Sequence, residues 1–249
     1  MSEKAFYNTL MSFKNIVIIM AMEVEALPLI TRLRIASPPI VIEPPLSIVA
    51  YQGSFESAIV TIVVNGKDKR YAVDSIGTQP ATLAAFLAIK KFQPDCIINA
   101  GTAGGFQKKG GVIGDVYVSA GSICYHDRRI LLPGFREYGI GSYPVFDVGP
   151  MAKQLHCKTG IVSTGNSLDA TEKDLEVIAA NNASVKEMEA AAIASIADCY
   201  QIPMIAVKAI TDIVDGDKPT HEEFLQNLAA ASENLQQKVV AILKYLVET

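Results

Sequence analysis

The chain is poor in the residues that build metal sites, disulfide frameworks and nucleic-acid surfaces. Its 249 residues include no tryptophan, three histidines and four cysteines, and the formal net charge is −4. The cysteines lack CxxC spacing and the histidines are far apart, so we expect reduced, buried thiols and no metal site. No basic cluster exceeds His126–Arg129, which argues against a nucleic-acid partner.

Long apolar runs and linkers are also missing. No run reaches the length of a membrane span, and the first residues lack the apolar core of a signal peptide. We therefore expect a cytoplasmic protein with no membrane partner. Half of the residues are hydrophobic and 19% are charged, which suits a large buried core. No Pro/Gly/Ser-rich segment divides the chain, so we expect one domain over Asn15–Thr249. Before it, Met1–Lys14 are expected to form a loosely held, flexible leader.

Short apolar runs alternate with helical patterns along the chain. This alternation predicts an α/β fold, a three-layer α/β/α sandwich around a mixed central β-sheet. The expected strands are Asn15–Ala21, Ser47–Gln52, Ala58–Val64, Asp95–Asn99, Val116–Ala120, Lys158–Ser163, Ser184–Met188 and Met204–Ala209. The expected helices begin near Glu23, Thr78, Thr171, Glu189 and Glu222. Ser37–Pro45 and Tyr125–Val145 are expected to be irregular connections.

Three acidic residues stand where predicted strands meet the segments that follow them. Asp212 follows the apolar run Met204–Ala209, and Glu25 and Glu189 open helices. Ligands bind at this edge in open α/β folds, and burial there would raise the pKa of a carboxyl group toward neutrality. Asp212 is then either a proton donor or the cap of a turn. Both glutamates could simply favour the helix dipole, and position alone decides none of these cases.

Glycines gather at the end of another predicted strand, in Gly101-Thr102-Ala103-Gly104-Gly105. Glycines let a backbone come close to a ligand, but the same cluster is typical of a tight turn. The pattern is neither GxGxxG nor a P-loop, so a generic dinucleotide-binding fold is not supported.

Five ordered segments together resemble one known family. They are IIMAMEVEALPL, IINAGTAGGF, STGNSLD, VKEMEAAAIA and AVKAITDIVDGDKPT. They resemble the nucleoside phosphorylase and nucleosidase superfamily and, within it, the plant-type branch of the 5′-methylthioadenosine nucleosidases. The resemblance runs from about Asn15 to the C-terminus. It implies a nucleoside phosphorylase-like fold and hydrolysis, without a cofactor, of the N-glycosidic bond of 5′-methylthioadenosine, with S-adenosylhomocysteine as a further substrate. The products would be adenine and 5-methylthioribose, a step of methionine salvage.

The resemblance also gives roles to the acidic residues. Asp212 matches the acid that protonates the departing purine, and Thr211 could hold its carboxyl group by a hydrogen bond. Glu25 matches the carboxylate that activates water, and Glu189 matches the residue that binds the ribose hydroxyls. The other substrate-binding positions that the resemblance implies are Thr102, Gly104, Leu168, Asp169, Lys186, Glu187 and Met188.

The chain departs from the family at two positions of the base-binding segment. Asn166 stands where relatives often have Asp, which bears on contacts to the adenine edge. Leu168 replaces an aromatic residue of bacterial relatives, although the plant-type branch also has Leu there. Neither change removes a catalytic group.

Two other functions remain open. Phosphorylases of the superfamily commonly carry an Arg where this chain has Asn99, and Glu25 would repel phosphate, so water is the expected nucleophile. Arg70 or Arg128 could fold back to supply a cation, which keeps a phosphorylase as the alternative. A remote alternative is a non-catalytic storage or binding protein on the same scaffold.

The resemblance further implies a homodimer in which a loop of one subunit closes the partner's pocket. The apolar stretch Ile130–Phe135 is the expected loop, with Leu131, Pro133 and Phe135 as its candidate residues. The plant-type branch also implies a preference for small, apolar 5′-alkylthio groups, because a charged amino-acid tail would need polar partners.

Overall fold

Strands and helices alternate along the chain, as the sequence pattern predicts. The computed structural model describes residues 12–36 and 38–248. Its strands are β1 (Asn15–Met20), β2 (Ile40–Val41), β3 (Val49–Phe55), β4 (Ala58–Val64), β5 (Cys96–Gly105), β6 (Val116–Tyr125), β7 (Tyr143–Pro144), β8 (Lys158–Thr164), β9 (Ala183–Glu187) and β10 (Met204–Ile213). Its helices are α1 (Glu23–Arg32), α2 (Thr78–Phe92), α3 (Arg136–Ile140), α4 (Gly149–Gln154), α5 (Glu172–Ala180), α6 (Ala190–Cys199) and α7 (Thr220–Glu248), with a 3-10 turn, η2, at Gln107–Lys109.

The strands form one mixed sheet, part of which closes on itself. Its order is β10-β6-β8-β9-β5-β1-β4-β3-β2, and β10 also pairs with β5. Strands β10, β6, β8, β9 and β5 therefore form a closed ring, from which β1, β4, β3 and β2 extend as an open sheet. Strand β5 is parallel to both β1 and β10 and antiparallel to β9. The mixed sheet was predicted, but its closure was not.

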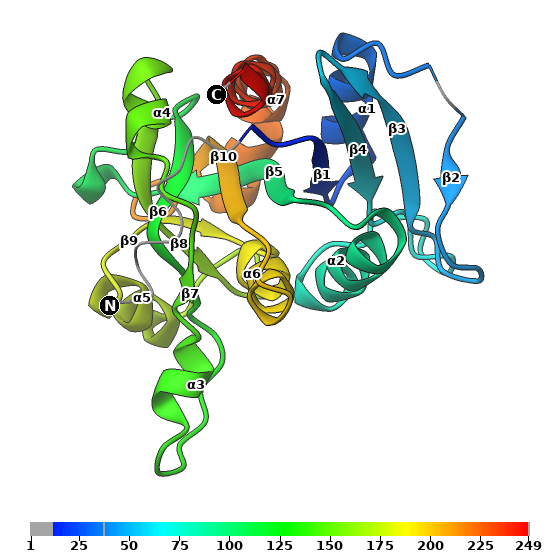
Figure 1. Cartoon of the computed structure of the whole chain (residues 1–249). Helices are drawn as coiled ribbons and strands as arrows, with labels where there is room; N and C mark the ends of the chain where they lie inside the picture. Colours follow the sequence, from blue (N-terminus) through cyan, green and yellow to red (C-terminus); the bar gives the residue numbers. More distant parts are fainter. Residues whose placement is uncertain (1–11, 37, 249) are drawn as a thin grey trace, which may run out of the picture.

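Helices cover both faces of the open part of the sheet, so the predicted three layers are confirmed (Figure 1). In β1, Ile16 and Ile18 belong to the core that includes α1 and α7, whereas Val17 and Ile19 belong to the core that includes α2 and α6. This alternation follows from the two-residue period of a strand. Both faces of β1 are apolar because both are covered.

The two strands that carry most of the candidate site run further than predicted. Strand β5 continues through the glycine cluster to Gly105, so the cluster is extended backbone and not a tight turn. Strand β10 continues to Ile213, so Asp212 is the second-to-last residue of the strand. In this region β5 pairs with β9 on one side and with β10 on the other.

The expected leader is only partly within the described residues. Met1–Met11 lie outside them, but Phe13 is buried at 3% exposure and its backbone N–H donates to Leu246 O at 3.0 Å. The packed domain therefore begins before Asn15, which corrects the boundary at Lys14. Among the described helices, none is long and apolar enough to cross a membrane.

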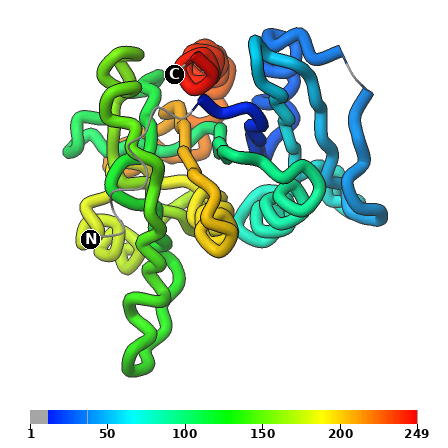
Figure 2. The backbone as a smooth tube through the Cα atoms, in the orientation of Figure 1, coloured from blue at the N-terminus to red at the C-terminus, as the bar shows by residue number. Residues whose placement is uncertain are grey.

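The connection between β6 and β8 is more structured than predicted. It contains α3, β7 and α4, and its first part projects from the body as an arm (Figures 1 and 2). Residues of the predicted partner loop lie in this arm. Leu131 is 95% exposed and Phe135 is 44% exposed.

Candidate active site

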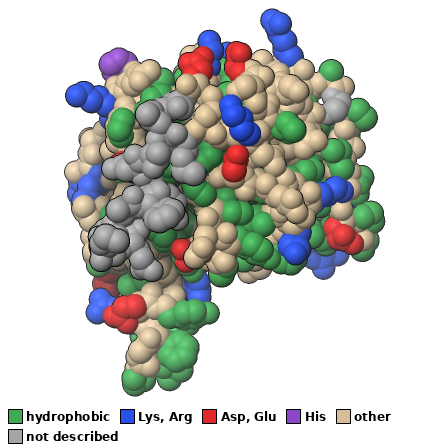
Figure 3. Space-filling model, viewed as in Figure 1, with side chains coloured by type: hydrophobic (Ala, Val, Ile, Leu, Met, Phe, Trp, Pro, Cys, Tyr) green, Lys and Arg blue, Asp and Glu red, His purple; other side chains and the backbone are tan. Residues whose placement is uncertain are grey.

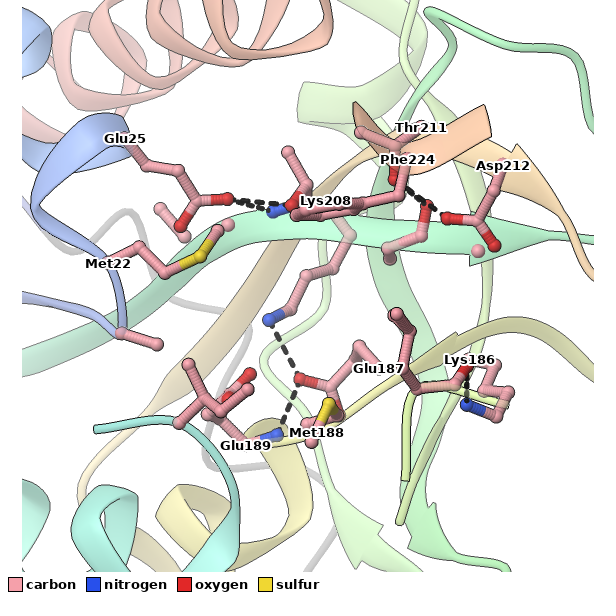
Figure 4. Close-up of a pocket in the computed structure, with 18 of the residues that line it drawn as sticks. Met22, Glu25, Lys186, Glu187, Met188, Glu189, Lys208, Thr211, Asp212 and Phe224 are labelled. Atoms are coloured by element: carbon pink, nitrogen blue, oxygen red, sulfur yellow. Dashed lines mark hydrogen bonds and ion pairs between the residues drawn. The ribbon is translucent and has the colours of Figure 1, made fainter. Parts of the chain in front are cut away.

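One pocket gathers the ends of β5, β9 and β10 together with the start of α1 (Figure 4). Its lining is mainly apolar, with a small set of charged side chains. The lining residues are Ala21, Met22, Glu25, Ile76, Ala100, Gly101, Thr102, Ala103, Gly104, Leu168, Lys186, Glu187, Met188, Glu189, Lys208, Thr211, Asp212, Val214 and Phe224. An apolar pocket with a few convergent ionisable groups is typical of a small-molecule site.

Glu25 enters the pocket from the first turn of α1. One carboxylate oxygen, Oε1, accepts hydrogen bonds from Thr102 N at 2.8 Å and Thr102 Oγ1 at 2.7 Å. A Cβ built at Gly101 would lie 3.6 Å from the other oxygen, Oε2, so this oxygen faces the glycine backbone. Burial raises the pKa of Glu25, while Thr102 and the charge of Lys208 oppose the rise. The carboxyl group of Glu25 therefore binds a proton more readily than an exposed glutamate does.

Asp212 enters from β10 at an irregularity in the sheet. The register with β5 shifts between Ile210 and Asp212, so Thr211 is an extra residue on this strand. Such a bulge re-aims side chains, and here Thr211 Oγ1 donates to Asp212 Oδ1 at 2.8 Å. Burial raises the pKa of Asp212, while the Thr211 bond and the charge of Lys186 lower it.

Gly104 is the residue that makes room for this carboxyl group. A Cβ at Gly104 would lie 2.7 Å from Asp212 Oδ2 and 2.6 Å from Val214 Cγ2, both closer than real contacts allow. The glycine cluster therefore permits a close approach between protein groups, whereas the approach to a ligand stays a prediction. The observed approach is that of Asp212 to the β5 backbone.

Glu189 lies across the pocket, at the residue before α6. Its Oε1 accepts a hydrogen bond from Gly77 N at 2.9 Å, which connects it to the start of α2. Burial raises the pKa of Glu189 to about 7, and the nearby Glu187 adds to the rise while Lys208 opposes it. Its negative charge is thus available at neutral pH but depends on its neighbours.

Lys208 is a charged pocket residue that the sequence interpretation missed. It lies in the middle of β10 at 1% exposure, and its Nζ is 2.8 Å from Glu187 Oε2. Burial disfavours its charged form, but Glu187, Glu189 and Glu25 together raise its pKa. The ammonium group is thus a shared counter-charge for three carboxylates. A lysine within an otherwise apolar strand was the available signal.

Glu187 and Lys186 line the pocket, but their polar atoms are already engaged by protein groups. Glu187 accepts hydrogen bonds from the backbone N–H groups of Glu189 and Ala190 and from Thr164 Oγ1. These bonds and Lys208 keep its pKa below the ordinary value, although burial would raise it. The residue acts as a structural anion, and Lys208 is its counter-ion.

Lys186 Nζ donates to Ser167 O at 2.7 Å and to Leu168 O at 2.9 Å. It thereby ties β9 to the segment after β8, the expected base-binding segment. Asn166 ties the same segment to α2, because its Oδ1 accepts from Thr78 N at 3.0 Å and Thr78 Oγ1 at 2.8 Å. Its Nδ2 donates to Asp127 Oδ2 at 3.0 Å. Asn166 thus connects neighbouring loops.

Most of the predicted site residues come together in this pocket. Asp169 does not, because it is exposed and is not part of the lining. The arm residues Leu131, Pro133 and Phe135 do not line it either. Within residues 12–36 and 38–248, no group of three or more His, Cys, Asp or Glu side chains is arranged to hold a metal ion.

Comparisons of this chain with known proteins agree on one family. The model of the phosphorylase superfamily matches residues 15–244. A 5′-methylthioadenosine/S-adenosylhomocysteine nucleosidase of Arabidopsis thaliana is 44% identical over 93% of this chain and 91% of its own length. A 5′-methylthioadenosine nucleosidase of the same plant is 41% identical over 93% of this chain and 87% of its own length.

The structural comparison agrees with the sequence comparison. The apo structure of Arabidopsis thaliana 5′-methylthioadenosine nucleosidase superposes with a TM-score of 0.91 at 40% identity, covering 94% of this chain and 96% of that one. Sequence and fold match over nearly the whole length of both proteins. The chain therefore belongs to the phosphorylase superfamily and, within it, to the family of the 5′-methylthioadenosine/S-adenosylhomocysteine nucleosidases.

Proposed function

We propose that the protein is a hydrolase that cleaves the N-glycosidic bond of 5′-methylthioadenosine, and also accepts S-adenosylhomocysteine. Cleavage of methylthioadenosine releases adenine and 5-methylthioribose. The observation that carries the proposal is the set of three buried carboxyl groups, Glu25, Glu189 and Asp212, around one apolar pocket. The family's nucleosidases, at up to 44% identity, support the same reaction.

Asp212 acts as the general acid in this proposal. Breaking the bond between ribose and purine leaves negative charge on the purine, and a proton delivered to its imidazole nitrogen neutralises that charge. A carboxyl group with a raised pKa keeps its proton to a higher pH than an ordinary aspartic acid and can donate it. The hydrogen bond from Thr211 orients the carboxyl group, and Gly104 leaves space beside it.

Glu25 and Glu189 act on the sugar. As the purine departs, the ribose gains oxocarbenium character, and nearby carboxylates stabilise this positive charge. Glu25 takes a proton from the attacking water, and Glu189 binds the ribose hydroxyls. Lys208 favours the anionic form of both glutamates, which both roles require. Met188, whose side chain lies beside Glu189 in Figure 4, supplies apolar contact to the substrate.

Water is the proposed nucleophile because both lysines that line the pocket are already engaged by protein groups. Lys186 Nζ donates to Ser167 O and Leu168 O. Asn99 Nδ2 donates to Ile19 O at 3.1 Å inside the sheet, and Lys208 is paired with buried Glu187. Arg70 lies over the Tyr71 ring and Arg128 over the Tyr125 ring, and neither arginine lines the pocket. A phosphate dianion beside Glu25 would meet like charge.

We expect adenine release from methylthioadenosine to proceed at the same rate with and without phosphate. The test is to incubate the purified protein with methylthioadenosine in phosphate-free buffer and quantify adenine and the sugar product. Free 5-methylthioribose is the expected product in both buffers. Release that depends on phosphate, with 5-methylthioribose 1-phosphate as product, would identify a phosphorylase instead.

We also propose a homodimer, supported by apolar side chains on one side of the molecule. The arm and the surface near α2 expose many large apolar residues, and Figure 3 shows apolar side chains over the arm. These exposed residues are Tyr71, Val73, Ile76, Leu83, Phe86, Leu131, Leu132, Phe135 and Tyr138. Such a surface is unfavourable in water and is typical of an interface. In the dimer, the Ile130–Phe135 loop would reach the partner's pocket.

We expect a dimer in sedimentation equilibrium at micromolar concentration. Leu131→Asp with Leu132→Asp would place charge in the interface and shift the protein toward monomer. Leu175→Asp, which changes an exposed apolar residue on α5, is the control and should leave the dimer intact. A wild-type monomer with full activity would contradict the proposal.

Methylthioadenosine should be preferred over S-adenosylhomocysteine. The lining of the pocket includes the apolar side chains of Met22, Ile76, Leu168 and Phe224. The charged amino-acid tail of S-adenosylhomocysteine would lose hydration there without a polar partner. We expect kcat/KM to favour methylthioadenosine by about tenfold. Equal values of kcat/KM for the two nucleosides would show that the tail finds polar contacts.

A further inference from the structure

The strand end that carries Asp212 is held by α7, through a residue to which the mechanism above gives no role. Glu223 is 7% exposed, and its Oε2 accepts a hydrogen bond from Ile213 N at 2.9 Å. Ile213 is the residue directly after Asp212. A second bond supports the same place, because Asn227 Nδ2 donates to Thr211 O at 2.9 Å. Both backbone neighbours of Asp212 are thus held by α7.

The charge of Glu223 also acts on Asp212. Two charged groups are close enough to influence Asp212: Lys186, from β9, and Glu223, from α7. Strand β5, which lies alongside, presents Ala103 and Gly104, which do not ionise. Lys186 favours the carboxylate form of Asp212, and Glu223 favours the protonated form.

We propose that Glu223 is a positioning residue for the acid: its carboxylate holds the backbone that carries Asp212, and its negative charge favours the protonated form that donates to the purine. The proposal rests on the proposed function for its catalytic meaning. The effect on the protonation of Asp212 does not depend on that function and can be measured separately.

A simpler reading is that Glu223 only favours the dipole of α7, as acidic residues in a first turn commonly do. Glu222 separates the two readings. It lies in the same first turn with the same charge, but it is exposed, whereas Glu223 is buried and bonded to the strand. The two glutamates therefore share the dipole effect, and Glu223 additionally contacts the Asp212 backbone.

The variant Glu223→Gln tests the charge while keeping the hydrogen bond. Its amide oxygen can still accept from Ile213 N, so the geometry is retained and the negative charge is lost. We expect the titration midpoint of Asp212 to fall by about half a unit to one unit. Glu222→Gln is the matched control and should leave the midpoint unchanged. The midpoint is read from carboxyl ¹³C signals, with Asp212 assigned by the signal lost in Asp212→Asn.

Kinetics provide the second readout. The alkaline limb of kcat/KM for adenine release should move to lower pH in Glu223→Gln, in step with the Asp212 midpoint. Glu223→Ala also removes the bond to Ile213 N and should lower kcat by about a further tenfold. An unchanged Asp212 midpoint in Glu223→Gln, or an equal shift in Glu222→Gln, would overturn the inference. If the wild-type protein releases no adenine but the Asp212 midpoint still shifts in Glu223→Gln, the inference stands and the proposed function is rejected.

Discussion

Asp212→Asn is expected to lower the turnover of methylthioadenosine by about 10²–10⁴-fold, the range for removal of a general acid. The Asn side chain has the size of Asp and can still accept the hydrogen bond from Thr211, but it has no acidic proton for the purine. Adenine release under saturating substrate measures the effect. Asp217→Asn makes the same Asp-to-Asn change at an exposed residue of the following loop, outside the pocket, and should retain wild-type turnover.

Whether Asp212→Asn is folded can be checked by measuring its stability to unfolding at several pH values. Burial raises the pKa of Asp212 in the native state, so native Asp212 binds its proton more tightly than the unfolded chain does. Wild-type stability from this group is present at low pH and is lost as pH rises through the native pKa. Asn does not ionise, so the variant should gain stability relative to wild type as pH rises above the ordinary pKa of an aspartic acid, as urea unfolding at acid and at neutral pH would show. Near-normal turnover by the folded variant would remove Asp212 from the mechanism.

The acidic residues could be predicted because each stands at a recognisable place in the chain. Asp212 follows an apolar run, and Glu25 and Glu189 follow strands at helix starts. Because α/β folds bind ligands at the carboxyl ends of their strands, the local sequence pattern was enough to place these residues at one edge of the sheet. The family motifs then gave these residues proposed roles beyond favouring a helix dipole, and these roles stay predictions.

The rest of the site depends on contacts between distant segments, which local patterns do not contain. Strand β5 was expected to stop at Asn99 because glycines usually interrupt strands, but its pairing with β9 and β10 extends it to Gly105. The closed ring of strands follows from the same pairing. The leader boundary was wrong for a similar reason, since Phe13 packs against the last helix, far away in sequence.

Lys208 shows this limit most clearly, because its charge is balanced by carboxylates only when three separate segments of the chain meet. Glu25 comes from α1, Glu187 is the last residue of β9, and Glu189 directly precedes α6. Each of these carboxylates acts on the Lys208 charge, and none is within eighteen residues of it in sequence. The lysine therefore couples the pocket glutamates to the fold, and its loss should affect both stability and activity.

Lys208→Met is expected to destabilise the protein by about 3–5 kcal/mol at neutral pH, the cost of leaving a buried charge without its partner. Methionine replaces the aliphatic part of the side chain, but Glu187 keeps a carboxylate buried among apolar groups. Without Lys208, burial should raise the pKa of Glu187 above its ordinary value, so the native state would bind a proton that the unfolded chain releases. The deficit should therefore shrink as pH falls toward 5. Urea unfolding at fixed protein concentration, at pH 7.5 and pH 5, measures it.

Two further variants distinguish the effect of breaking the Lys208–Glu187 ion pair from the effect of losing a lysine. Lys173→Met, on the exposed side of α5, should unfold like the wild type. Glu187→Gln combined with Lys208→Met removes both charges and should recover much of the stability lost in the single variant, because neither side chain is then a buried ion. Adenine release should remain low in the double variant, since Glu25 and Glu189 still lack the cation that favours their anionic forms. Full activity in a stable double variant would limit Lys208 to a structural role, and a single variant as stable as wild type would show that Glu187 needs no counter-ion.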